Sequence, residues 1–220
     1  MHAATPGLFD ANTDPQATRQ TLCDGAMLLR GFARVRDHEV LEALDEVIRA
    51  APWRHMLTPG GSRMSVAMSN CGELGWISDR RGYRYTARDP QTDMPWPVMP
   101  EVFLRLACDA AAEAGFAGFP PDACLINRYE PGAKMSLHQD RDERDLSQPI
   151  VSVSLGLPAM FLFGGERRND KPMRIPLTHG DVVVWGGKAR LRHHGVLPLK
   201  AGTHPALGAC RINLTLRKAA

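Results

Sequence analysis

The sequence predicts an α+β fold in which an antiparallel sandwich or jelly roll is braced by two helices. Two helical patterns occur before residue 116, and from Asp122 onward the hydrophobic period changes to two. Candidate strands then follow at close spacing, separated by glycine, proline and Asn-Asp turn signals, which is typical of sandwiches and jelly rolls. With 220 residues, 44% of them hydrophobic, the chain is long enough to bury a core within one domain.

The composition indicates the cellular compartment of the protein but does not identify its binding partners. A net charge of +3 at pH 7 permits a polyanionic partner without requiring one. The 5 cysteines are scattered and form no Cys-x-x-Cys, which favours free thiols in a reducing compartment. No stretch reaches the roughly 18 apolar residues of a membrane helix, and the start of the chain carries no signal-peptide pattern. We therefore expect a cytoplasmic protein without a membrane partner.

The N-terminal part contains a strand and two supporting helices. Residues 26–32 have the pattern of a strand, and Asp37 is a suitable N-cap for a helix that reaches about Ala50. A second helix follows Pro100 and ends at Gly115. The spacing of their apolar residues predicts packing and no chemistry. These residues are Val40, Leu41, Leu44, Val47 and Ile48 in the first helix, and Phe103, Leu106, Ala107, Ala110 and Ala114 in the second.

Residues 51–96 lack any sustained period and mix aromatic side chains with cations. Aromatics interleaved with arginines suit a surface that stacks bases and neutralises phosphates. The alternative is a hairpin-rich insertion whose aromatics pack on the domain below, and the local pattern alone favours that alternative. The residues concerned are Trp76, Tyr83 and Tyr85, lying among Arg63, Arg80, Arg81, Arg84 and Arg88.

Seven candidate strands follow the second helix. They occupy residues 123–129, 150–157, 160–163, 174–177, 181–185, 192–196 and 209–216.

A candidate metal site begins at His138-Gln139-Asp140, after the Pro131-Gly132 turn. Residues two apart in an extended segment point to the same side, so His138 and Asp140 can direct an imidazole and a carboxylate at one ion. Two histidines and one carboxylate on one face are the ligands of non-haem Fe(II) oxygenases. An ordinary surface ion pair is the alternative. His193 and His194 are both candidates for the second histidine, and the sequence cannot choose between them, although we favour His194.

The last strand supports a second ligand beside the metal. Arg211, Asn213, Thr215 and Arg217 alternate with apolar residues, so two guanidinium groups and two neutral polar groups share one face without any acid. Arginine binds carboxylates through paired N–H groups, and two arginines on one wall suit a small dianion. A metal with open positions beside a dicarboxylate site is interpreted as Fe(II) with 2-oxoglutarate.

From about residue 26 to Arg217 the chain resembles the AlkB-type DNA-repair dioxygenases. The resemblance rests on long, ordered stretches. They include Thr58-Pro59-Gly60-Gly61, Met64-Ser65-Val66-Ala67-Met68, Leu74-Gly75-Trp76, Leu125-Ile126-Asn127-Arg128-Tyr129, Leu137-His138-Gln139-Asp140, Val151-Ser152-Val153-Ser154-Leu155-Gly156, His179-Gly180-Asp181-Val182-Val183-Val184-Trp185 and the final Arg-x-Asn-x-Thr-x-Arg.

The resemblance implies a fold and a set of roles. The fold is a double-stranded β-helix (jelly roll) braced by helices, with an N-terminal nucleotide-recognition lid that overrules the packing interpretation of residues 51–96. Arg217 would bind the far carboxylate of 2-oxoglutarate and Arg211 its keto-acid end. Trp76 would stack on a flipped base opposite His138, while Tyr83 and Tyr85 would hold backbone phosphate. The implied sets are His138, Asp140 and His194 for the metal; Asn127, Tyr129, Arg211, Asn213 and Arg217 for 2-oxoglutarate; and Trp76, Tyr83, Tyr85, Asp142 and Arg168 for the substrate.

The same resemblance implies one structural domain with three parts: a tail (1–25), support helices and lid (26–120), and a catalytic jelly roll (121–220). The implied reaction is oxidative demethylation of 1-methyladenine or 3-methylcytosine in DNA, single-stranded by preference, with RNA as a further substrate. It uses Fe(II), O₂ and 2-oxoglutarate, releases succinate, CO₂ and formaldehyde, and repairs alkylation damage directly. We expect a monomer.

Three alternatives stay open at this point. The nearest is a 2-oxoglutarate-dependent hydroxylase of a protein or small molecule; the others are a non-catalytic jelly-roll binder and a nucleic-acid module with a structural metal. The chain also departs from the family, since Arg192 and His193 replace two aromatics and Leu216 replaces one.

Overall fold

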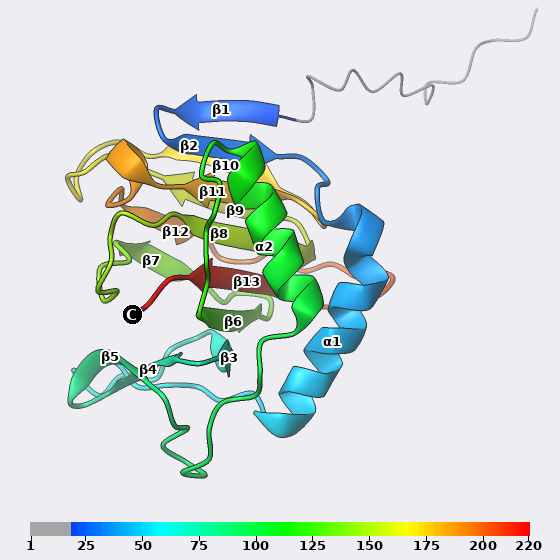
Figure 1. Ribbon diagram of the computed structural model, residues 1–220, viewed down its shortest axis with the longest axis vertical. Coiled ribbons are helices and arrows are strands. Elements are labelled where there is room, and N and C mark those ends of the chain that lie inside the picture. Colours follow the sequence, from blue (N-terminus) through cyan, green and yellow to red (C-terminus); the bar gives the residue numbers. More distant parts are fainter. Residues whose placement is uncertain (1–18) are drawn as a thin grey trace, which may run out of the picture.

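The computed structural model describes residues 19–220, so the first 18 residues of the expected tail lie outside the described residues. Two antiparallel sheets face each other, and a separate hairpin lies beside one end of the larger sheet (Figure 1). The larger sheet has seven strands in the order β1-β2-β11-β8-β13-β6-β3. Their bounds are β1 Arg19–Cys23, β2 Ala26–Leu29, β3 Ala67–Gly72, β6 Ala123–Tyr129, β8 Ile150–Gly156, β11 Val182–Trp185 and β13 Arg211–Arg217.

The smaller sheet has four strands in the order β10-β9-β12-β7, and the hairpin consists of β4 and β5. The bounds in the smaller sheet are β7 Met135–His138, β9 Ala159–Phe163, β10 Met173–Leu177 and β12 His194–Val196. The hairpin strands are β4 Gly75–Asp79 and β5 Gly82–Thr86. All these pairings are antiparallel, as the period of two predicted.

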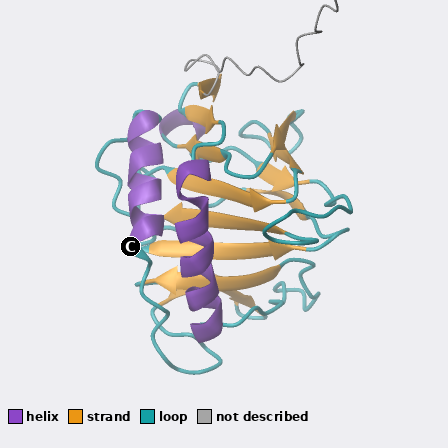
Figure 2. Ribbon diagram, turned by 90° about the vertical axis from the view of Figure 1, so that its right-hand side faces the viewer, coloured by secondary structure: helices purple, strands orange, loops and turns teal. Residues whose placement is uncertain are grey.

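Two helices, α1 (Asp37–Ala50) and α2 (Glu101–Glu113), cover the same face of the larger sheet (Figure 2). Their apolar stripes form one core cluster with inward residues of β8, β11 and β13, including Val40, Phe103 and Leu214. Short 3₁₀ helices, η2 (Arg34–Arg36) and η3 (Gly187–Ala189), precede α1 and β12. Among residues 19–220, no helix is long and apolar enough to cross a membrane.

A second core lies between the two sheets. Val182 and Val184 of β11 belong to the cluster under the helices, whereas Val183 and Trp185 belong to the cluster shared with the smaller sheet. Because β11 is buried on both faces, its sequence is a continuous apolar run instead of an alternating one. The space between the sheets is where the polar residues of β13 point.

The expected α+β jelly roll is confirmed, with three differences in detail. β1 occupies residues 19–23, which lie within the expected tail, and pairs with β2. β3 lies in the segment expected to form the lid, but it pairs with β6 and completes the larger sheet. Asp37 is the first residue of α1 and not its N-cap, and its carboxylate accepts from His179 Nε2 at 3.2 Å.

A valine pair tests the packing of α1. Val40 is fully buried beneath the helix, and Val35 in the preceding turn is 87% exposed. We expect Val40→Ala to lower the free energy of unfolding by about 2 kcal/mol, the loss of two methyl groups and the resulting cavity. Val35→Ala removes the same atoms from a solvated position and should leave stability unchanged. Urea unfolding followed by circular dichroism measures both, and equal effects would contradict this packing.

Candidate metal and co-substrate site

Two histidines meet across the smaller sheet. His138 ends β7, His194 begins β12, and the two residues are register partners in the antiparallel pairing of these strands. Their ring centroids lie 4.4 Å apart. The two strands can approach so closely because Gly195 follows His194: a Cβ at this position would lie 2.7 Å from the carbonyl oxygen of Met135. Strand pairing therefore brings together two side chains that are 56 residues apart in sequence.

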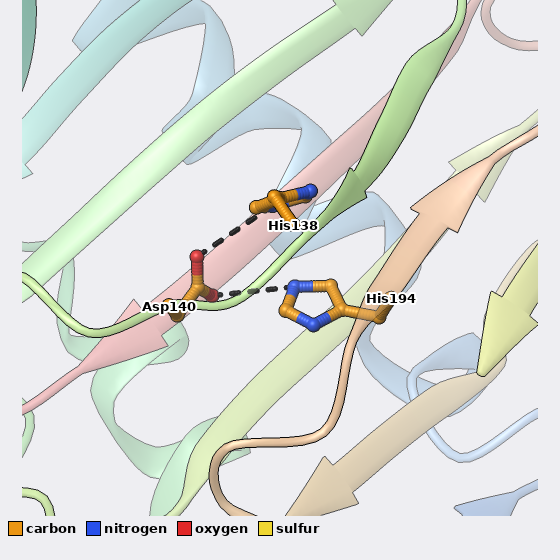
Figure 3. A group of neighbouring side chains, drawn as sticks. All are labelled: His138, Asp140 and His194. Atoms are coloured by element: carbon orange, nitrogen blue, oxygen red, sulfur yellow. Dashed lines mark ion pairs between the residues drawn. The ribbon is translucent and has the colours of Figure 1, made fainter. Parts of the chain in front are cut away.

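Asp140 completes a group of three possible metal ligands. Its carboxylate oxygens lie 3.6 Å from His138 Nε2 and 3.5 Å from His194 Nε2 (Figure 3). One ligand atom from each residue lies within 4.8 Å of the others. Each imidazole directs Nδ1 at the carbonyl oxygen two residues earlier, at 2.9 Å from His138 and 3.1 Å from His194. With the proton on Nδ1, both Nε2 lone pairs face Asp140, so the donor set suits Fe(II).

The protonation states agree with metal binding. Burial, and then the neighbouring His194, lower the pKa of His138 to about 4, so this imidazole is neutral near pH 7. Burial alone would raise the pKa of Asp140, but the charge of Arg217 brings it well below the usual range. A neutral imidazole and an ionised carboxylate are the forms that bind a metal.

Arg217 connects Asp140 to a chain of buried charges. Its Nη2 donates to Asp140 Oδ2 at 2.6 Å, and its Nε lies 3.5 Å from Glu143 Oε1. Arg190 donates to Glu143 Oε2 at 2.9 Å and to the backbone carbonyl of Asp140 at 2.6 Å. Sequence reasoning missed Glu143 and Arg190. The only sequence signal was an acid close to Asp140, which does not identify a partner 47 residues away.

Arg211, at the other end of β13, is a buried cation without an acidic partner within the described chain. Its Nη2 donates to Ser154 Oγ at 3.0 Å and its guanidinium lies 5.0 Å from the ring centre of Tyr129, but Nε and Nη1 have no hydrogen-bond partner. Asn127 Oδ1, on the neighbouring strand, is likewise buried without a partner. Unpaired buried polar groups are costly, and a carboxylate placed here would accept from Nε and Nη1 of Arg211. The pocket therefore fits the dianion 2-oxoglutarate.

The two arginines of β13 have different partners within the protein. Arg217, expected at the far carboxylate of 2-oxoglutarate, hydrogen-bonds the carboxylate of Asp140. Arg211, expected at the keto-acid end, lies six residues along β13, beside Tyr129 and Ser154. Between them, Asn213 Nδ2 donates to Ser152 Oγ at 2.8 Å and to the carbonyl of Val153 at 2.9 Å.

One cavity of about 740 Å³ joins the histidines, the polar face of β13 and part of the hairpin. Trp76 and Tyr83 line it as a stacked pair, with ring centres 5.5 Å apart and planes at 15°. Trp76 Nε1 donates to Asp142 Oδ2 at 2.8 Å. Asp142 and Arg168 also line the cavity, and both are exposed.

Tyr85, expected to hold backbone phosphate, does not line the cavity of Trp76 and Tyr83. Its hydroxyl donates to Glu143 Oε1 at 2.7 Å and accepts from Arg217 Nη1 at 3.0 Å. Of the three residues that depart from the family, His193 lines the cavity, and Arg192 lies 5.7 Å from the ring centre of Phe163. His194, and not His193, belongs to the metal-binding group.

Removing the Asp140 charge tests the buried ion pair. In Asp140→Asn, Arg217 loses its closest anion, so we expect unfolding in urea with EDTA to become easier by about 3 kcal/mol. Mn²⁺ affinity, measured by calorimetry, should fall at the same time. Asp79→Asn is the matched control, because Asp79 pairs with Arg84 at the surface and should change neither quantity. Equal destabilisation in the two variants would contradict the special cost at Asp140.

Comparisons with known proteins agree with this geometry. Residues 25–217 match the 2OG-Fe(II) oxygenase superfamily. The chain is 55% identical over 96% of its length to the alpha-ketoglutarate-dependent dioxygenase AlkB of Escherichia coli, covering 98% of that protein. It is 56% identical over 97% of its length to AlkB of Salmonella typhimurium, covering 99%.

A solved structure described as that of OsALKBH1 superposes with a TM-score of 0.79 at 30% identity, covering 91% of this chain and 99% of that one. Sequence relatives and fold thus identify the same enzymes. The protein belongs to the 2OG-Fe(II) oxygenase superfamily and, within it, to the AlkB-type dioxygenases, which use Fe(II), 2-oxoglutarate and O₂.

Proposed function

We propose that this dioxygenase removes alkyl groups oxidatively from bases of nucleic acids, with 1-methyladenine and 3-methylcytosine in DNA as its main substrates. The observation that carries the proposal is one cavity lined both by the stacked pair Trp76 and Tyr83 and by the His-Asp-His group. A flat aromatic base stacked on this pair would share the cavity with the residues that would hold the metal, so its methyl group would face the oxidising centre.

Positive charge at the cavity supports a nucleic-acid substrate over a protein or small metabolite. Arg63, Lys134, Arg141 and Arg168 all line the cavity and are exposed, and none forms an ion pair within residues 19–220. Four free cations around an aromatic slot suit a base whose neighbouring phosphates remain outside. We assign Tyr83 and Arg168 to this backbone contact and leave Tyr85 out of it.

Charge also favours damaged bases over sound ones. The carboxylate of Asp142 lies beside Trp76, so a cationic methylated base stacked on the indole would be attracted to it. Such lesions cannot pair normally and are easier to extrude from a duplex, and a single strand offers them without unpairing. We therefore propose single-stranded DNA as the preferred form, and RNA as a further substrate, because none of these contacts requires a deoxyribose.

The metal-binding and co-substrate-binding roles belong to different residues of the cavity. His138, Asp140 and His194 would hold Fe(II), which with 2-oxoglutarate and O₂ supplies the oxidising power to hydroxylate the N-methyl group. Arg217 would face the keto-acid end of 2-oxoglutarate, and Arg211 its far carboxylate. The hydroxylated methyl group leaves as formaldehyde, and the co-substrate leaves as succinate and CO₂. Asn127, Tyr129 and Asn213 complete the polar wall.

Three broader assignments belong to the same proposal. We assign the lid to the β4–β5 hairpin and its flanks, inside one structural domain, because β3 belongs to the larger sheet. We propose a monomer, since one chain supplies every part of the cavity. We propose a cytoplasmic enzyme, since the five cysteines within the described chain are free thiols.

The decisive experiment is mass spectrometry of a single-stranded oligonucleotide that carries one 1-methyladenine. Incubation with protein, Fe(II), ascorbate and 2-oxoglutarate should remove about 14 mass units, one methylene group, and release formaldehyde. His138→Ala should abolish both signals. Succinate formation without any change in the oligonucleotide would instead favour a protein or small-molecule hydroxylase.

Neutralising two cations of the cavity tests the backbone contact. We expect Arg63→Gln combined with Lys134→Gln to weaken oligonucleotide binding in fluorescence anisotropy. The slope of log K against log salt should fall by about 0.7 for each phosphate that the protein no longer neutralises. Arg49→Gln with Arg105→Gln removes the same charge from α1 and α2, on the far face of the larger sheet, and should leave the slope unchanged. An equal decrease in both double variants would show that net charge alone matters.

A further inference from the structure

Arg217 receives a contact from outside the two catalytic sheets. Its guanidinium is buried, and three groups surround it: Asp140 at 2.6 Å, Glu143 at 3.5 Å and the hydroxyl of Tyr85 at 3.0 Å. Asp140 and Glu143 belong to the segment that follows β7. Tyr85 belongs to β5 of the hairpin, which forms its own two-stranded sheet. A lid residue therefore reaches the arginine beside the metal-binding carboxylate.

The hydroxyl of Tyr85 acts both as a donor and as an acceptor. It donates its proton to Glu143 Oε1 at 2.7 Å and accepts from Arg217 Nη1, so it must be neutral to make both bonds. Burial raises the pKa of Tyr85 well above its usual value, which keeps the proton in place. Arg190 fixes Glu143 from the other side, at 2.9 Å, and is itself buried. The tyrosine is thus held in one orientation against Arg217.

The same hairpin also presents the aromatic wall of the cavity. Trp76 of β4 is the register partner of Tyr85, so the two side chains lie on the same face of the hairpin. Two side-chain hydrogen bonds attach this hairpin to adjacent residues: Trp76 to Asp142 and Tyr85 to Glu143. Asp142 and Glu143 lie two and three residues after the metal-binding Asp140 along the chain. The position of the hairpin is therefore tied to the position of Arg217.

We propose that Tyr85 is a positioning residue that holds Arg217 in place for 2-oxoglutarate, so that the nucleotide-recognition lid contributes to co-substrate affinity. The inference rests on the proposed placement of Arg217 at the keto-acid end of 2-oxoglutarate. Tyr85 itself touches neither metal nor co-substrate. Without its hydroxyl, Arg217 Nη1 loses an acceptor, and the guanidinium can turn toward Glu143, whose Oε1 also loses a donor.

Tyr85→Phe tests this with the smallest change available, since the ring and its packing remain. We expect the dissociation constant of 2-oxoglutarate to rise on the order of fivefold, a fraction of what a hydrogen bond to a charged group contributes. Calorimetry on the Mn²⁺-loaded protein measures it without turnover or nucleic acid. The Mn²⁺ affinity, from a separate titration, should stay within about twofold of the wild type, because His138, Asp140 and His194 are unchanged.

Steady-state kinetics supply the second readout. KM for 2-oxoglutarate should rise in Tyr85→Phe, while kcat at saturating 2-oxoglutarate, followed as succinate, is retained. Arg84→Gln is the matched control: Arg84 precedes Tyr85 on β5 and pairs with Asp79 inside the hairpin. It removes this surface ion pair without changing any contact of Tyr85 or Arg217, and it should leave 2-oxoglutarate affinity unchanged.

The measurements distinguish a positioning role of Tyr85 from a purely structural one. An unchanged 2-oxoglutarate affinity in Tyr85→Phe would overturn the proposal. A parallel loss of Mn²⁺ and 2-oxoglutarate affinity, or an equal effect of Arg84→Gln, would also overturn it in favour of a structural role. Because the binding measurement needs no nucleic acid, a failure of base demethylation would leave this result interpretable by itself.

Discussion

The pairing of β13 between β8 and β6 is the constraint on which the site depends. This central strand is hydrogen-bonded on both sides along nearly its whole length, so its register cannot slip without breaking two ladders. A shift by one residue would turn Ile212, Leu214 and Leu216 toward the cavity and bury the polar set against the helices. Register thus fixes which face of one strand is core and which is binding site.

Buried charge is distributed unequally along that strand. Around Arg217, two arginines and two carboxylates balance one another, with Arg190 and Glu143 as the outer pair. Arg211 has no acidic partner within residues 19–220, and burial lowers its pKa. Because the charge of Arg217 is balanced by carboxylates and that of Arg211 is not, the Arg211 end of β13 is the one suited to bind an added anion. In the proposed arrangement, this asymmetry would orient 2-oxoglutarate with its keto-acid end toward Asp140 and its far carboxylate toward Arg211.

Periodicity allowed much of this fold to be predicted, because β6, β13 and both helices carry clear patterns of two or 3.6 residues. β3 was not recognised as part of the sheet, since Ala67–Gly72 has no alternation. The metal group followed from the spacing of His138 and Asp140, but adjacent histidines have opposite faces, and only the register with β7 selects His194. The partners of Arg217 and the position of Glu143 depend on contacts between distant segments, which a single sequence does not reveal.

The place of β7 at the edge of the smaller sheet has a consequence for the metal. This strand has four residues, and within residues 19–220 it pairs with β12 alone. An ion held by His138 and His194 is therefore also a cross-link between an edge strand and its neighbour. Metal binding and the pairing of β7 with β12 would then be thermodynamically linked. The iron needed for the reaction would also stabilise the edge of the smaller sheet.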